Sequence, residues 1–113
     1  MKVAIITGAS SGIGEATAHA LANEGFAVVL CARSYDKLDK LKNDLLAKVY
    51  NAIAVKADVT SRTEMKAVAK EALDAYGQID VLINNAGIMP LSFLKNLHED
   101  EWEQMTDVNI KGA

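Results

Sequence analysis

The chain has 113 residues, of which 50% are apolar and 24% charged, and its formal net charge is −3. This length fits a single domain, residues 1–113, with the composition of an ordinary soluble globular protein. The interspersed charges offer no basic surface for nucleic acid, and no apolar run approaches the ~20 residues that span a bilayer. The sole cysteine, Cys31, lies in an apolar run, which predicts a buried thiol. With no signal peptide evident after Met1, we expect a cytoplasmic protein.

Short apolar runs alternate with helical patterns along the chain. The runs are Val3–Thr7, Ala27–Ala32, Ala52–Ala57 and Ile79–Asn84. Their hydrophobicity is continuous rather than alternating, which is typical of parallel strands covered on both faces. Strands that alternate with helices in this way predict βαβ units with right-handed crossovers. The sequence therefore predicts an α/β fold: a Rossmann-type parallel sheet of order 3-2-1-4, flanked by helices and truncated before the remaining strands.

Helical periodicity fills the intervals between these runs. The expected apolar faces are Ile13, Ala16, Thr17, Ala20 and Leu21 in the first helix and Leu38, Leu41, Leu45 and Val49 in the second. Gly25 is expected to stop the first helix. Ser61 and Glu64 have capping-box spacing and predict the start of the third, which we expect to end at Gly77.

A fourth helix is expected to begin near Leu97–Asp100. Its apolar side would carry Trp102, Met105 and Val108. If the sheet ends at the fourth strand, Ile79–Asn84 becomes an apolar edge with a free row of N–H and C=O groups, protected only by Asp80. Such an edge tends to pair with another chain, so we expect a homo-oligomer.

The segment "TGASSGIG", residues 7–14, holds three of the seven glycines and joins the first strand to the first helix. Gly8 would allow a tight turn, Gly12 would let a pyrophosphate approach the backbone, and Gly14 would let the helix pack closely on the strand. The free N–H groups at the helix N-terminus would attract the phosphates. The residues expected to bind a dinucleotide here are Thr7, Gly8, Ser10, Ser11, Gly12, Ile13 and Gly14. No Gly-Lys-Ser/Thr follows, which excludes a phosphate-transfer P-loop.

The glycine spacing, G-x-x-x-G-x-G, together with "NNAG" at residues 84–87 and "NIKG" at 109–112, resembles the short-chain dehydrogenase/reductase family from Val3 to Ala113. The resemblance implies an oxidoreductase that acts on alcohol or carbonyl groups with a nicotinamide dinucleotide. It implies that Asp58 accepts a hydrogen bond from the adenine amine and that Val59 packs on the ring, although Asp58 also suits a turn residue ahead of Ser61.

The two later motifs carry further implied roles. The segment containing Asn85, Ala86 and Gly87 would steady the central sheet and line the nicotinamide-ribose side, and Asn85 could equally be structural. Asn109 matches the asparagine of the family's Asn-Ser-Tyr-Lys catalytic set, where it supports a water linked to the lysine.

That catalytic set is incomplete in this sequence. The family's tyrosine is followed four residues later by lysine, whereas Tyr35, Tyr50 and Tyr76 are followed at that place by other residues. The resemblance therefore implies that the catalytic Ser, Tyr and Lys would come after Asn109, and that this chain by itself does not turn over. Two interpretations stay open: the cofactor-binding part of an oxidoreductase, which we favour, or a non-catalytic nucleotide-binding or assembly module completed by another chain.

The end of the second strand bears on the choice of cofactor. A site that prefers NAD places an acidic residue there to bond the ribose 2′-OH. Here Ala32 stands at that place and Arg33 follows. An arginine can bond a 2′-phosphate through its planar fork, so the sequence predicts NADP(H) rather than NAD(H). His19 and His98 have no partner at a metal-ligand spacing, so we expect no metal. The charges at residues 37–44 are interpreted as a solvated helix face.

Overall fold

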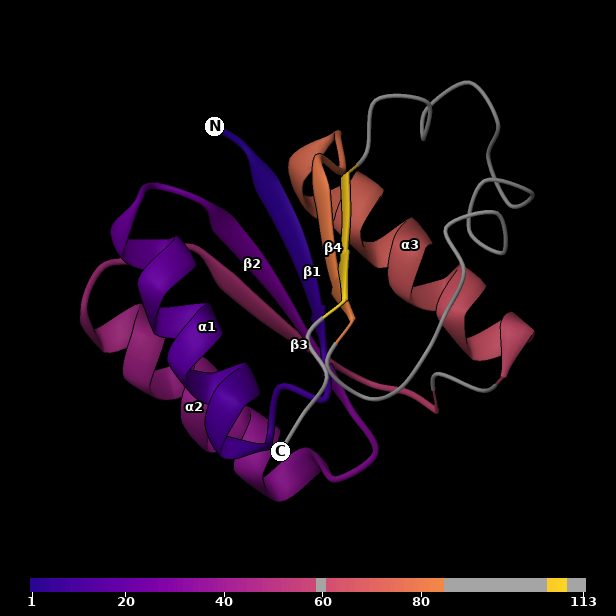
Figure 1. Cartoon of the computed structure of the whole chain (residues 1–113), viewed down its shortest axis with the longest axis horizontal. Coiled ribbons are helices and arrows are strands. Elements are labelled where there is room, and N and C mark those ends of the chain that lie inside the picture. The colour runs from indigo at the N-terminus through magenta and orange to yellow at the C-terminus, as the bar shows by residue number, and fades with distance from the viewer. Residues whose placement is uncertain (59–60, 85–105, 110–113) are drawn as a thin grey trace.

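The computed structural model describes residues 1–58, 61–84 and 106–109. Its elements in chain order are β1 (Val3–Thr7), α1 (Gly12–Asn23), β2 (Ala27–Ala32), α2 (Tyr35–Ala47), β3 (Ala52–Lys56), α3 (Arg62–Tyr76), β4 (Val81–Asn84) and β5 (Thr106–Asn109). The strands form a parallel sheet of order β3-β2-β1-β4-β5, with α1 and α2 on one face and α3 on the other (Figure 1). The predicted fold class and the order 3-2-1-4 are confirmed.

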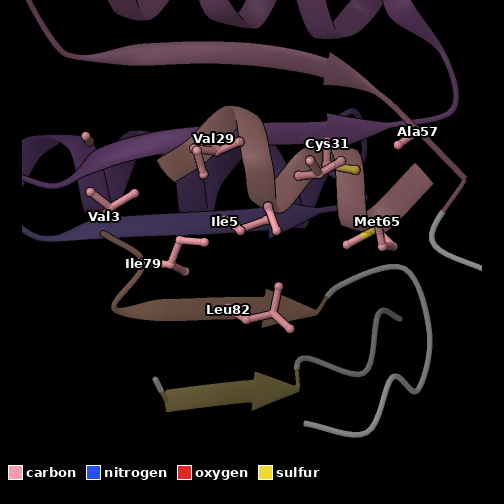
Figure 2. Packing of buried hydrophobic residues seen from close by; sticks show 12 residues of the cluster. Val3, Ile5, Val29, Cys31, Ala57, Met65, Ile79 and Leu82 are labelled. Carbon is pink, nitrogen blue, oxygen red and sulfur yellow. The ribbon is translucent and has the colours of Figure 1, made fainter. Parts of the chain in front are cut away.

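Strands β1 and β2 are buried along their whole length. Because successive side chains of a strand point to opposite faces, each strand supplies two cores. Ile5 and Val29 pack with Met65 on the α3 side of the sheet (Figure 2). Ile6 and Leu30 belong to the second core, which packs under α1 and α2. This double burial explains why the strands are continuously apolar.

Helix α1 packs through a different face from the expected one. Its buried residues are Gly14, Ala18 and Ala22, whereas Ile13 and Ala16 are exposed. The apolar residues of α1 surround most of the helix, so their periodicity does not single out one face. The small side chains decide the orientation because they let the helix axis lie close to the sheet.

Helix α2 buries the predicted stripe as far as Leu45, but Val49 is not part of it. The helix ends at Ala47, and Val49 lies beyond it with φ of +65° and 91% of its surface exposed. Its N–H and that of Tyr50 bond back to the carbonyls of Leu46 and Leu45, which closes the helix end. Val49 thus occupies the left-handed position that usually takes glycine.

We predict that Val49→Gly stabilises the protein. A left-handed conformation costs an L-residue roughly 1–2 kcal/mol, and glycine's greater flexibility offsets only part of that gain. The expected rise in the free energy of unfolding is about 1 kcal/mol in a urea titration. Lys48→Gly is the matched control, because Lys48 has an ordinary φ of −91°. A control variant as stable as Val49→Gly would contradict this explanation.

Helix α3 has the predicted boundaries. The Ser61 hydroxyl accepts a hydrogen bond from the Glu64 N–H at 3.3 Å and caps the first turn. Gly77 ends the helix with φ of +78°, and its N–H donates to the Leu73 carbonyl at 2.7 Å. Helix α3 packs against one face of β1 and β2.

The expectation of an unpaired β4 edge is wrong. β4 pairs in parallel with β5, so that Val81 is aligned with Thr106 and Asn84 with Asn109. The prediction that Val108 lies in a fourth helix is also wrong, because Val108 is in β5; the remainder of that predicted helix, up to Met105, lies outside the described residues. Pairing to β4 satisfies backbone groups that an edge would leave free, and β-branched Thr106 and Val108 suit a strand.

Cys31 is fully buried between the sheet and α3, as the sequence predicted (Figure 2). Burial, with a smaller effect from Glu64, raises the pKa of the Cys31 thiol to about 12.

We therefore predict that a disulfide reagent labels Cys31 very slowly at pH 8 in the folded chain and rapidly in urea. The thiolate, which is the reactive form, is scarce when the pKa is raised. Because the folded-state pKa exceeds the ordinary value of 9.0, this group's contribution to stability is complete below pH 9 and declines as the pH rises toward 12. Equal labelling rates in folded and unfolded protein would show that the Cys31 thiol is not buried.

Candidate functional site

The glycine loop after β1 is held by hydrogen bonds around Ser11. The Ser11 hydroxyl donates to the Gly8 carbonyl at 2.9 Å and accepts from the Gly14 N–H at 3.1 Å, so it caps α1. The Ser11 N–H also donates to the Gly8 carbonyl. Gly8 has φ of +61°, which confirms the tight turn expected there. The loop is therefore built without needing a ligand to shape it.

The N-terminus of α1 keeps the two N–H groups that a phosphate needs. Those of Gly12 and Ile13 have no hydrogen-bond partner among the described residues. A Cβ built on Gly12 would meet no atom within 4 Å, so the space in front of this backbone is open. Unpaired N–H groups at the positive end of a helix form an anion site. Gly14, in contrast, is buried.

A buried polar pair joins β1 to β4 at the carboxyl edge of the sheet. The Thr7 hydroxyl donates a hydrogen bond to Asn84 Oδ1 at 3.0 Å, with the Ile83 carbonyl 3.3 Å away, and both Thr7 and Asn84 are fully buried. Asn84 Nδ2 is buried with no hydrogen-bond partner among the described residues. Asn84 is aligned with Asn109 of β5, so three polar residues stand in register across this edge.

We predict that Thr7→Val lowers the free energy of unfolding by about 1–3 kcal/mol, because it deprives a buried amide oxygen of its donor. Thr7→Ser keeps the hydroxyl and should lose less. Thr17→Val is the matched control: Thr17 is more exposed and bonds only its own helix, at the Ile13 carbonyl. Equal losses in the Thr7 and Thr17 valine variants, measured by denaturant titration, would contradict the role given to the buried pair.

Arg33 and Asp58 meet at the ends of β2 and β3. Arg33 Nη2 lies 3.4 Å from Asp58 Oδ2, and the side chains are 80% and 29% exposed. This contact is longer than the 2.7–2.9 Å of a strong charge-assisted bond, and exposed ion pairs contribute little. The pair brings together the two residues expected to contact the adenosine end of a dinucleotide. It also draws Arg33 toward β3, which lies on the opposite side of β2 from the glycine loop.

A cavity of about 300 Å³ lies between the glycine loop, α1 and α2. Its lining residues are Ala9, Ser10, Glu15, Lys37, Lys40, Leu41 and Asp44. The sequence placed Ser10 at the binding site but treated the charges of α2 as a solvated face. The spacing of Lys37, Lys40, Leu41 and Asp44 puts them on one side of α2; the three charged residues are exposed, as the sequence predicted, and Leu41 is buried.

The remaining expected site residues are Val59, Asn85, Ala86 and Gly87, and they lie outside the described residues. The backbone of Asn109 lies in β5. Within residues 1–58, 61–84 and 106–109 no group of three or more His, Cys, Asp or Glu side chains could hold a metal. No helix in this part of the chain is long and apolar enough to cross a membrane.

A parallel sheet with a glycine loop at the carboxyl end of β1 and free N–H groups at the next helix defines a Rossmann-type nucleotide-binding protein. The sequence model of the family described as short chain dehydrogenase matches residues 2–113. The chain therefore belongs to the short-chain dehydrogenase/reductase family. It is 54% identical over 112 residues to an uncharacterized oxidoreductase of Listeria innocua, a match that covers 99% of this chain and 45% of that protein.

Solved structures agree with this assignment. A short-chain dehydrogenase/reductase from Burkholderia phymatum, in complex with NAD, has a TM-score of 0.74 and 39% identity, and the match covers 77% of this chain and 31% of that chain. A variant of actinorhodin polyketide ketoreductase with NADPH has a TM-score of 0.73 and 39% identity, with coverage of 77% and 33%. Relatives of this fold thus bind either nicotinamide dinucleotide. This chain spans less than half of the length of these proteins.

Proposed function

We propose that residues 1–113 form the NADP(H)-binding part of a short-chain oxidoreductase that acts on alcohol or carbonyl groups. The observation that carries the proposal is the glycine loop, where Ser11 fixes the turn and the N–H groups of Gly12 and Ile13 have no hydrogen-bond partner among the described residues. These two groups donate to the pyrophosphate. Family membership supports the reaction class, since the matched relative from Listeria innocua is an oxidoreductase.

The other residues have separate tasks in this proposal. Asp58 accepts a hydrogen bond from the adenine amine, with Val59 beside the ring. Asn85, Ala86 and Gly87 line the nicotinamide-ribose side, and Asn109 is the candidate member of the catalytic set. The bound nicotinamide supplies or accepts the hydride. Because none of the three tyrosines is followed by lysine four residues later, the chain by itself binds cofactor without turnover.

Self-association stays a prediction. The sequence analysis based this prediction on an unpaired β4, whereas in the structure β4 pairs with β5.

Titration calorimetry with NADP⁺ and NAD⁺ tests the cofactor. We expect NADP⁺ to bind more tightly, because Ala32 stands where an NAD-preferring site has its acidic residue and Arg33, the next residue, carries a planar cation. Arg33→Ala should narrow the difference by about tenfold, as for the loss of a charge-assisted hydrogen bond. Lys66→Ala, at an exposed position on α3, is the control and should leave both affinities unchanged. Equal or tighter binding of NAD⁺ by the unmutated chain would disprove the preference.

A further inference from the structure

The Arg33–Asp58 ion pair lies at the carboxyl edge of the sheet, where β2 has a neighbour on each side. The N–H of Ala9, in the glycine loop, donates to a β2 carbonyl at 3.1 Å, and that of Ala57, after β3, donates to the last β2 carbonyl at 3.0 Å. Arg33 directly follows β2, so it stands between the glycine loop and the end of β3. Its side chain takes the β3 side, where Nη2 lies 3.4 Å from Asp58 Oδ2.

The two partners of this pair are held very differently. Asp58 directly follows the buried Ala57, its carbonyl accepts the Ser61 N–H at 3.0 Å, and its side chain is 29% exposed. The Arg33 side chain is 80% exposed, and Asp58 is its one hydrogen-bond partner among the described residues. That contact uses a single nitrogen of a guanidinium with several N–H donors. Arg33 is therefore the partner that can move to another anion, while Asp58 stays at the end of β3.

A phosphate group competes with the Asp58 carboxylate for Arg33. Both anions accept hydrogen bonds from the same planar N–H groups of the guanidinium. Asp58 lies on the far side of β2 from the glycine loop. A ligand bound along that loop must therefore attract Arg33 against a carboxylate that attracts it in the opposite direction.

We propose that the Arg33–Asp58 ion pair is an autoinhibitory contact that limits the preference for NADP(H). The inference rests on the proposed function and deepens it. Asp58 holds the Arg33 guanidinium on the β3 side of β2, and NADP(H) gains its contact with Arg33 only by displacing that carboxylate. The free energy of the pair is thereby subtracted from the affinity for NADP(H). NAD(H) carries no 2′-phosphate, so it leaves the pair intact. Asp58 is a positioning residue that acts through Arg33 and sets the size of the preference.

The test is calorimetric titration of NADP⁺ and NAD⁺ into the unmutated chain, Asp58→Asn, Arg33→Ala and the double variant. The ratio of the two affinities is the readout, because the adenine contact proposed for Asp58 is common to both dinucleotides and cancels. Asp58→Asn should raise the ratio in favour of NADP⁺ by about two- to fivefold, the range for an exposed ion pair. In the Arg33→Ala background the same change should leave the ratio as it is, because the residue through which Asp58 acts is missing.

Two further variants separate the ion pair from a general effect of charge. Asp36→Asn is the matched control: it removes an exposed carboxylate from the first turn of α2, and no ion pair joins Asp36 to Arg33 among the described residues. It should change the ratio by less than Asp58→Asn does. Asp58→Glu keeps a carboxylate at the end of β3 and should keep the ratio of the unmutated chain. A rise with Asp36→Asn as large as that with Asp58→Asn would overturn the inference.

The outcomes separate this inference from the function on which it rests. If the unmutated chain binds neither dinucleotide, the proposed function fails. If it prefers NADP⁺ but Asp58→Asn does not raise the ratio, or raises it equally with and without Arg33, the function stands and the inference is overturned. Should Asp58→Asn bind too weakly to measure, the side-chain N–H resonances of Arg33 in the unmutated chain decide the question. NADP⁺ should shift them and NAD⁺ should not, and a shift with both or with neither contradicts the autoinhibitory contact.

Discussion

Double-sided burial of β1 and β2 is the constraint on which the rest of this structure depends. Each strand is fully buried and pairs in parallel along its whole length, residue Val3 with Ala27 through Thr7 with Cys31. In such a sheet the backbone N–H and C=O groups of neighbouring strands bond to one another. Because the strands are parallel, their carboxyl ends lie at the same edge. The loops that leave those ends must therefore gather at the same place, and they carry the glycine loop and the Arg33–Asp58 pair.

Close packing of α1 on this sheet is the second determinant of the site. The helix approaches through Gly14, Ala18 and Ala22, so its first turn lies directly beside the end of β1. Ser11 then satisfies the Gly14 N–H, while those of Gly12 and Ile13 have no partner in residues 1–58, 61–84 and 106–109.

Electrostatics at this edge is divided between two groups of residues. Arg33 and Asp58 form an ion pair at the ends of β2 and β3, and its contribution to stability is small because Arg33 is 80% exposed. The cavity beside Ser10 combines two lysines and two carboxylates without an ion pair between them among the described residues.

The sequence by itself determined the fold class, the order of the first four strands, the caps of α3 and the glycine loop, because each depends on local spacing: continuous apolar runs, Ser61 with Glu64, and three glycines after a strand. It also placed Cys31 in the core. It did not predict which face of α1 contacts the sheet, since apolar residues surround most of that helix. It also did not predict the exposure of Val49, which lies outside the buried stripe of α2 because the helix ends at Ala47. Pairing of β5 with β4 and the cavity wall formed by Lys37 and Lys40 were decided by the tertiary structure, because both arise between elements distant in sequence, where the available partner rather than local periodicity selects the conformation.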